Sequence, residues 1–245
     1  MTPIQSLLTK GKRLFRACLP KQFDYTKFVI LAHARTGSNY LRNGLLQLDC
    51  VRLEEEIFAS HNRKIGENYE KIIGDIFRPV EKGISHVGFK LFYYHLTPEE
   101  LKKLLSISEL KVIHLIRRNK LRTIISLDKA RQSDQWVATK KGGSEPVTIA
   151  CHDLVDRINK IEAYEKNFSA HFVSHDLLEL SYEQLTEQPE TAFKNVSDFL
   201  HLPSIDFQKI TLKKQGNRSI KQDVTNADEV ERALRGTPYG VYLSF

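Results

Sequence analysis

The sequence predicts an α/β protein with a P-loop-like, three-layer α/β/α architecture around a central parallel sheet. Short apolar runs alternate with segments whose leucines and isoleucines recur at helical spacing, a pattern typical of parallel strands covered by helices on both faces. A strand–loop–helix pattern over residues 28–46 opens this alternation. The 245 residues show no repeat or low-complexity tract, so we expect one domain, 25–245. Lys10, Lys12, Arg13 and Arg16 predict a basic extension, 1–24, before it.

Four apolar runs are the predicted strands. They cover residues 28–32, 86–92 (HVGFKLF), 112–116 (VIHLI) and 177–182 (LLELSY). Short, mostly apolar runs are typical of strands buried on both faces of a parallel sheet. In such sheets ligands bind beyond the carboxyl ends of the strands. The loops after Ala32, Leu91 and Ile116 are therefore the candidate site.

Helix-start signals lie between these strands. Thr97 as N-cap, Pro98 at the first helical position and Glu100 completing a capping box predict one helix. Asn119 is a good N-cap for another, which carries an apolar face of leucine and isoleucines. Residues 140–146 (KKGGSEP) predict a loop, and their glycines suit a mobile lid.

The net charge of +7 favours anionic partners. Lysine and arginine are dispersed among 30 acidic residues, which disfavours an RNA- or DNA-binding module. Cys18, Cys50 and Cys151 lie far apart without a CxxC pair, so we expect neither disulfides nor zinc, and a cytoplasmic setting. The extension lacks a long apolar run and is expected to be neither signal peptide nor transmembrane segment. It is expected to pack as a helix, although peripheral contact with an anionic membrane stays open.

The loop after Ala32 keeps the cradle of a P-loop but not its hydrolytic groups. A hydrolytic loop, G-x-x-x-x-G-K-[ST], places lysine and a magnesium-binding hydroxyl after its second glycine. Here Gly37 keeps the tight turn, but Ser38 and Asn39 stand at those two positions. The following helix offers free amides and a positive dipole end, and Arg35 adds a fixed cation for a tetrahedral oxyanion.

The strand end after Ile116 also departs from a nucleotide hydrolase. Arg117, Arg118 and Asn119 stand there, where a magnesium-dependent enzyme would place an acidic residue. We therefore expect no metal. An atypical P-loop kinase or NTPase and a non-catalytic nucleotide-binding protein remain the alternatives. His171 and His175 are spaced i, i+4 without a third ligand, and we expect both to be structural.

Together these motifs resemble sulfotransferases that use 3′-phosphoadenosine 5′-phosphosulfate (PAPS), especially the bacterial carbohydrate sulfotransferases. The segment ARTGSNYL resembles their 5′-phosphosulfate loop. Arg118 and Ser126, in RRNKLRTIIS, match their R-x7-S signature for the 3′-phosphate. Residues 111–136 are similar to rhizobial nodulation-factor and trehalose sulfotransferases. Two departures are Asn39, where threonine is frequent, and Ala34, where proline is common.

The resemblance implies transfer of a sulfuryl group from PAPS to a hydroxyl of a carbohydrate, glycolipid or lipo-oligosaccharide, leaving 3′,5′-adenosine bisphosphate (PAP). Arg35 would stabilise the leaving phosphate. Glu56 would be the general base, with its neighbour Glu55 in reserve. The resemblance does not identify the acceptor, and it leaves open whether the chain forms a homodimer.

The other site residues implied by the resemblance divide between nucleotide and acceptor. For the nucleotide they are Arg35, Thr36, Gly37, Ser38, Asn39, Arg118 (with Arg117 competing), Ser126, Tyr182, Lys214, Gln215 and Arg218. For the acceptor they are Lys90, Glu55, Gln132 and Trp136. A structural role is the alternative for Lys90, and a core position is the alternative for Tyr182 and Trp136.

Overall fold

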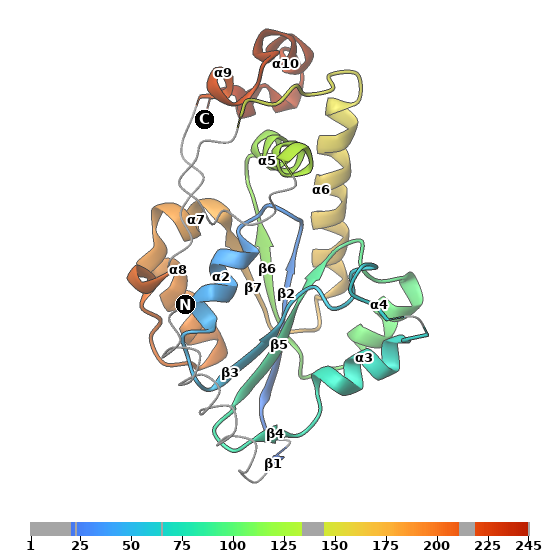
Figure 1. Ribbon diagram of the computed structural model, residues 1–245, viewed down its shortest axis with the longest axis vertical. Helices are drawn as coiled ribbons and strands as arrows, with labels where there is room; N and C mark the ends of the chain where they lie inside the picture. The colour runs from blue at the N-terminus through green and yellow to red at the C-terminus, as the bar shows by residue number, and fades with distance from the viewer. Residues whose placement is uncertain (1–20, 23, 65, 134–144, 211–218, 245) are drawn as a thin grey trace.

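The computed structural model describes residues 21–22, 24–64, 66–133, 145–210 and 219–244 (Figure 1). Its strands are β1 (Lys21–Gln22), β2 (Thr26–Ala32), β3 (Val51–Glu54), β4 (Val80–Glu81), β5 (His86–Phe92), β6 (Lys111–Ile116) and β7 (Leu177–Ser181). Its helices are α2 (Ser38–Leu45), α3 (Tyr69–Ile76), α4 (Pro98–Leu105), α5 (Lys120–Ser133), α6 (Leu154–His171), α7 (Tyr182–Glu187), α8 (Pro189–Leu200), α9 (Ile220–Asp223) and α10 (Ala227–Leu234), with 3-10 turns η1 (Phe207–Lys209) and η2 (Pro238–Ser244).

The central sheet confirms the predicted fold class. Within the described chain it has five strands in the order β3-β5-β2-β6-β7, and every neighbouring pair is parallel. Ala32 at the end of β2 pairs with Phe92 of β5 and Leu115 of β6. The carboxyl ends of these three strands therefore lie level, and the loops that follow them share one edge of the sheet.

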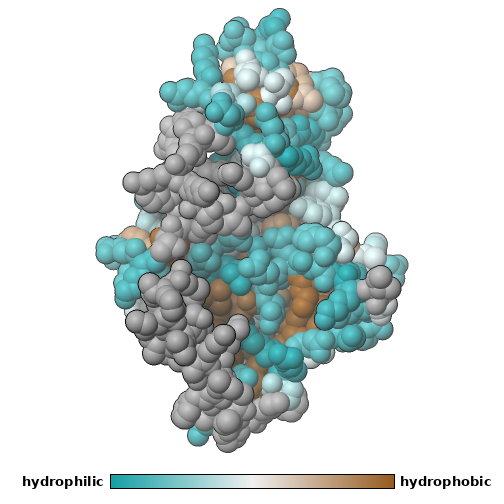
Figure 2. Space-filling model, viewed as in Figure 1, coloured by the Kyte–Doolittle hydropathy of each residue, from teal (hydrophilic) through white to brown (hydrophobic). Residues whose placement is uncertain are grey.

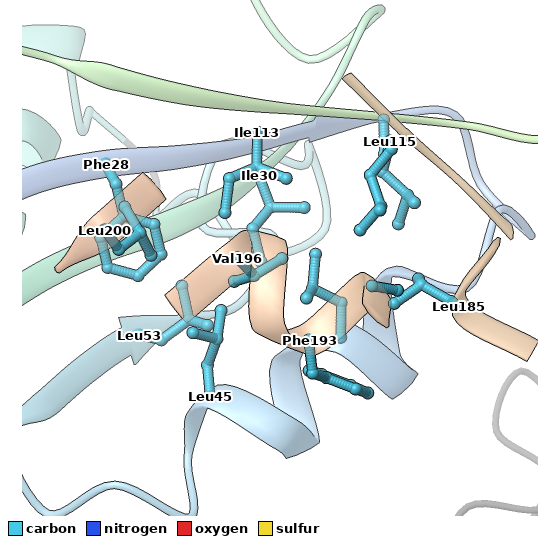
Figure 3. Close-up of a cluster of buried hydrophobic side chains, with 14 of the residues drawn as sticks. Phe28, Ile30, Leu45, Leu53, Ile113, Leu115, Leu185, Phe193, Val196 and Leu200 are labelled. Carbon is cyan, nitrogen blue, oxygen red and sulfur yellow. The ribbon is translucent and has the colours of Figure 1, made fainter. Parts of the chain in front are cut away.

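Helices cover both faces of the sheet, as Figure 1 shows. Because side chains alternate along a strand, Phe28 and Ile30 of β2 face one layer while Val29 and Leu31 face the other. The first layer is built from α2, α7 and α8, and its core is drawn in Figure 3. The second layer contains α3, α4 and the end of α6.

A third cluster of buried apolar residues lies beyond the carboxyl edge of the sheet. It joins α5 and the first half of α6 to α9 and α10, which stand together at the top of Figure 1. Thr97, Pro98 and Glu100 form the predicted capping box of α4, and the Asn119 side chain accepts the backbone N–H of Arg122 at the start of α5.

Two sequence predictions fall largely on undescribed residues. Of the extension 1–24, residues 1–20 and 23 lie outside the described chain, as do residues 140–144 of the loop 140–146. Most of the described surface visible in Figure 2 is hydrophilic. In the part of the chain that the structure describes, no helix is long and apolar enough to cross a membrane.

Candidate functional site

A cavity of about 1620 Å³ lies at the edge of the sheet where the carboxyl ends of the strands meet. Ligand pockets for small molecules span roughly 300–1,000 Å³, so this space has room for a nucleotide and a second substrate. The lining residues come from the loops after β2, β3, β5 and β6, from the start of α2 and α7, and from α5 and α6.

One wall is the loop of residues 33–39, which we call the anion loop. Its backbone is left-handed at Arg35 (φ 69°) and Gly37 (φ 91°). The Thr36 hydroxyl donates to the carbonyl of His33 at 2.8 Å and closes the turn. A Cβ atom on Gly37 would lie 2.9 Å from Cδ2 of Tyr182, so sterics and φ both require glycine there.

The anion loop ends at the N-terminus of α2, which faces the cavity. Gly37 is the N-cap residue, no side chain caps α2, and its first turn contains no acidic residue. Ser38 and Asn39, which open this helix, line the cavity. The amides and positive dipole end of α2 are therefore available to a phosphate-like group.

A buried lysine joins the anion loop to a glutamate. The Nζ atom of Lys90 lies 2.6 Å from Oδ1 of Asn39 and 2.9 Å from Oε1 of Glu56, and the lysine side chain is 1% exposed. The register of β3 and β5 explains why Lys90 and Glu56 meet. Glu54, two residues before Glu56, pairs with Phe89, the residue before Lys90. The backbone carbonyl of Glu56 is fixed by Asn62, whose side-chain amide donates to it at 2.8 Å.

Glu55 lies in different surroundings, although it also lines the cavity. Its side chain is 62% exposed, and its carboxylate lies 3.2 Å from a guanidinium nitrogen of Arg42. Of the two predicted candidates for the base, Glu56 is therefore the one that contacts Lys90.

The cavity is also lined by Arg63, Tyr94 and His95, which the sequence did not single out. His95 Nδ1 accepts the backbone N–H of Phe92 at 3.2 Å, and burial lowers the pKa of this imidazole to about 4, against an opposing effect of Glu56. Arg63 binds the Glu100 carboxylate through two nitrogens at 2.7 and 3.0 Å and also donates to the His95 carbonyl. Tyr94 is 50% exposed. The available signal was the position of Tyr94 and His95 just beyond the carboxyl end of a predicted strand.

The turn after β6 contributes Arg117 to the cavity, while Arg118 is exposed and is not among the lining residues. Arg117 stacks on Tyr182, with its guanidinium carbon 4.3 Å from the ring centroid. Ser126, on α5, accepts the Nε–H of Arg35 at 2.9 Å. Burial lowers the pKa of the Arg35 guanidinium. The structure thus brings Arg35, Ser126 and Tyr182 together.

The remaining predicted residues contribute less. Gln132 is exposed near the end of α5 and does not line the cavity. Trp136, Lys214, Gln215 and Arg218 lie outside the described residues. Among the described residues there is no group of three metal-ligating side chains. His171 and His175 bond backbone carbonyl groups, at 2.6 and 3.2 Å.

Comparison with known proteins gives consistent matches. The model of the Stf0 sulphotransferase family matches residues 47–232. Nodulation protein H of Rhizobium tropici is 30% identical over 235 residues, covering 88% of this chain and 92% of that protein. Nodulation protein H of Rhizobium meliloti (strain 1021) is 28% identical over 236 residues, with 88% and 94% covered.

A solved structure shares the fold. The sulfotransferase domain from the curacin biosynthetic pathway superposes with a TM-score of 0.51 at 12% identity, covering 89% of this chain and 94% of that one.

Proposed function

The chain belongs to the Stf0 sulphotransferase family, and from this premise we propose that it transfers a sulfuryl group from PAPS to a hydroxyl of a carbohydrate, glycolipid or lipo-oligosaccharide. One observation carries the proposal. The anion loop and Glu56 face the same cavity, and Lys90 bridges them at 2.6 and 2.9 Å. Lys90 thereby holds the anion loop, which would bind the donor, next to Glu56, which would accept the proton.

The anion loop fits the phosphate end of the donor. Arg35 and the uncapped start of α2 offer a cation, amides and a positive dipole. When bound, the donor supplies an activated sulfuryl group whose departure leaves charge on a 5′-phosphate. Groups that stabilise this charge most strongly as it develops accelerate transfer, and we assign that role to Arg35. Thr36, Gly37, Ser38 and Asn39 shape the loop around it.

The second phosphate of the donor needs a separate cation. We assign the 3′-phosphate to Arg118 and Ser126, as the R-x7-S spacing implies. The exposed Arg118 side chain has no hydrogen bond or ion pair to any described residue, so it is available for an anion. The hydroxyl of Ser126 already lies in the cavity beside Arg35. We also assign Tyr182, which lines the same cavity, to the nucleotide.

We assign to Glu56 the role of general base for the acceptor hydroxyl. Lys90 orients this carboxylate and brings a positive charge to the point between donor and acceptor. Tyr94 and Tyr164 line the cavity together with Asp153 and Arg157. Aromatic rings beside planar charged groups suit a saccharide, which has apolar C–H faces and many hydroxyl groups.

Nucleotide binding provides a direct test. In metal-free buffer, PAP at 100 times its Kd should stabilise the protein by about 2.7 kcal/mol, visible as a raised thermal midpoint, and ATP with magnesium should give a smaller shift. The opposite ranking would remove the sulfotransferase assignment.

Group transfer is tested with ³⁵S-labelled PAPS and a panel of neutral oligosaccharides, glycolipids and lipo-oligosaccharides. We expect the label to appear in at least one of these acceptors, and only when enzyme is present. Transfer to none of them, by protein that binds PAP, would reject the carbohydrate acceptor class.

A further inference from the structure

Arg117 and Arg118 are adjacent in the sequence but lie in opposite environments. The Arg118 side chain is exposed, and its backbone N–H donates to the Glu183 carboxylate at 3.1 Å. The Arg117 side chain is partly buried, its Nε atom is fully buried, and it lines the cavity. The two cations cannot have the same function, although both follow the same strand.

Two donor nitrogens of Arg117, Nη1 and Nε, lie against protein. Its Nη1 donates to the backbone carbonyl of Arg35 at 3.3 Å. Its guanidinium carbon lies over the Tyr182 ring, 4.3 Å from the ring centroid. Nε has no oxygen partner among the described residues, and the Tyr182 ring and the nearby Glu183 carboxylate offset part of the cost of burying this charge.

The carbonyl that Arg117 holds belongs to a strained residue. Arg35 has φ 69°, a left-handed conformation that costs a non-glycine residue about 1–2 kcal/mol and persists where the surroundings enforce it. The same Tyr182 ring lies against Gly37, the second left-handed residue of the anion loop. Arg117 and Tyr182 together therefore contact both unusual backbone positions of this loop.

We propose that Arg117 is a positioning residue that locks the anion loop through the Arg35 carbonyl, and that it does not bind the nucleotide's 3′-phosphate. This inference rests on the proposed function for its choice of ligands. A planar guanidinium can stack on a ring and donate in its own plane at once, whereas an ammonium cannot. The role therefore requires arginine, while a phosphate ligand would tolerate lysine.

Two nucleotides separate these roles. PAP and adenosine 5′-phosphate share the 5′-phosphate that the anion loop would hold, and only PAP has the 3′-phosphate. We expect Arg117→Lys and Arg117→Gln to weaken both nucleotides by the same factor, about tenfold, measured by titration calorimetry without metal. The ratio of the two affinities should stay at its wild-type value. The matched control, Arg118→Gln, should weaken PAP alone and so lower that ratio.

The inference fails if Arg117→Gln lowers the affinity for PAP alone. It also fails if Arg117→Lys binds PAP with an affinity within about twofold of wild type. Hydrogen exchange of the ligand-free variants gives a second readout. Amides of residues 35–39 should exchange about tenfold faster in both Arg117 variants, without faster exchange in β2, β5 and β6, and at the wild-type rate in Arg118→Gln. Uniformly faster exchange would mean a general loss of stability and would also reject the inference.

The two proposals can fail separately. Wild-type protein that binds neither nucleotide would refute the proposed function, and the exchange experiment would still decide whether Arg117 holds the loop.

Discussion

The Nζ atom of Lys90 lies 2.9 Å from Oε1 of Glu56, at the end of a side chain that is 1% exposed. A buried ammonium is costly unless it is paired and hydrogen-bonded, and here Glu56 and Asn39 supply both interactions. Asn39 belongs to the anion loop, and Glu56 follows β3. One cation therefore links the two parts of the proposed site.

Replacing Glu56 tests its assignment as base. Glu56→Gln keeps the shape of the side chain but removes the proton acceptor, so we expect turnover to fall by about 100-fold or more and PAP affinity to stay within about threefold. Glu55→Gln is the matched control, because the Glu55 side chain is 62% exposed and its carboxylate faces Arg42. It should lower turnover by less than about fivefold. A larger loss for Glu55→Gln than for Glu56→Gln would reverse the assignment.

Lys90→Met should separate chemistry from nucleotide binding. The change removes the charge between Asn39 and Glu56 but keeps a long apolar side chain in the same space. We expect kcat to fall about 100-fold, while the Kd of PAP changes less than about threefold, because Arg35 and the start of α2 remain. A loss confined to nucleotide binding would show that Lys90 serves the anion loop and not the transfer step.

The sequence predicts the central strands of the sheet because each is a short, mostly apolar run. The runs at 86–92 and 112–116 reproduce β5 and all but the first residue of β6. The two-residue strands β1 and β4 carry no such signal, because two residues show no period. The position of the site followed from topology, since loops after parallel strands meet at one edge.

The sequence could not separate neighbouring residues of the same chemistry. Glu55 and Glu56 differ only in how the turn after β3 aims them, and that turn is fixed by contacts such as Asn62 to the Glu56 carbonyl. Arg117 and Arg118 differ in the same way. His95 was missed because its ring folds back to the Phe92 N–H, a contact that no periodicity encodes.

Gly37→Ala should impair nucleotide binding in particular. The new Cβ would meet Tyr182 at 2.9 Å, and φ at this residue is 91°. Gly83→Ala is a matched control, because φ there is 102° and nothing lies within 4 Å of the added atom. Both variants should lose about 1–2 kcal/mol of stability from the left-handed backbone, but only Gly37→Ala should weaken PAP binding, by about tenfold or more. Equal PAP affinities in the two variants would contradict this role for the loop.

Stability should fall on acidification below neutral pH. Burial lowers the pKa of His33, His86, His95 and His114, in the case of His95 to about 4. The pKa of a histidine in the unfolded chain is about 6.5. Below that pH the unfolded chain binds more protons than the folded chain, so the free energy of unfolding decreases as the pH falls from about 6.5 toward 4.

A variant of His95 measures its share of this loss. We expect His95 to account for a loss in free energy of unfolding on the order of 1–2 kcal/mol, a figure reduced because its side chain is partly exposed. His95→Gln should flatten the decline in free energy of unfolding, measured in urea at pH 7.5, 6 and 5, relative to wild type. An unchanged slope would show that His95 is protonated equally in both states.

Asp223 should contribute more to the stability of the fold than an ordinary surface carboxylate does. It is 8% exposed and receives Arg122 at 2.9 Å and Lys129 at 2.6 Å, which ties α9 to the helix that carries Ser126. Asp223→Asn keeps the shape but removes the carboxylate charge that both largely buried cations contact, so we expect a loss of about 3 kcal/mol, or roughly 6–12 °C in thermal midpoint. Asp198→Asn is the control, because its ion pair with Lys194 is exposed on both sides and should contribute about 0–1 kcal/mol. Equal midpoints for the two variants would mean that the Asp223 cluster adds no more than a surface pair.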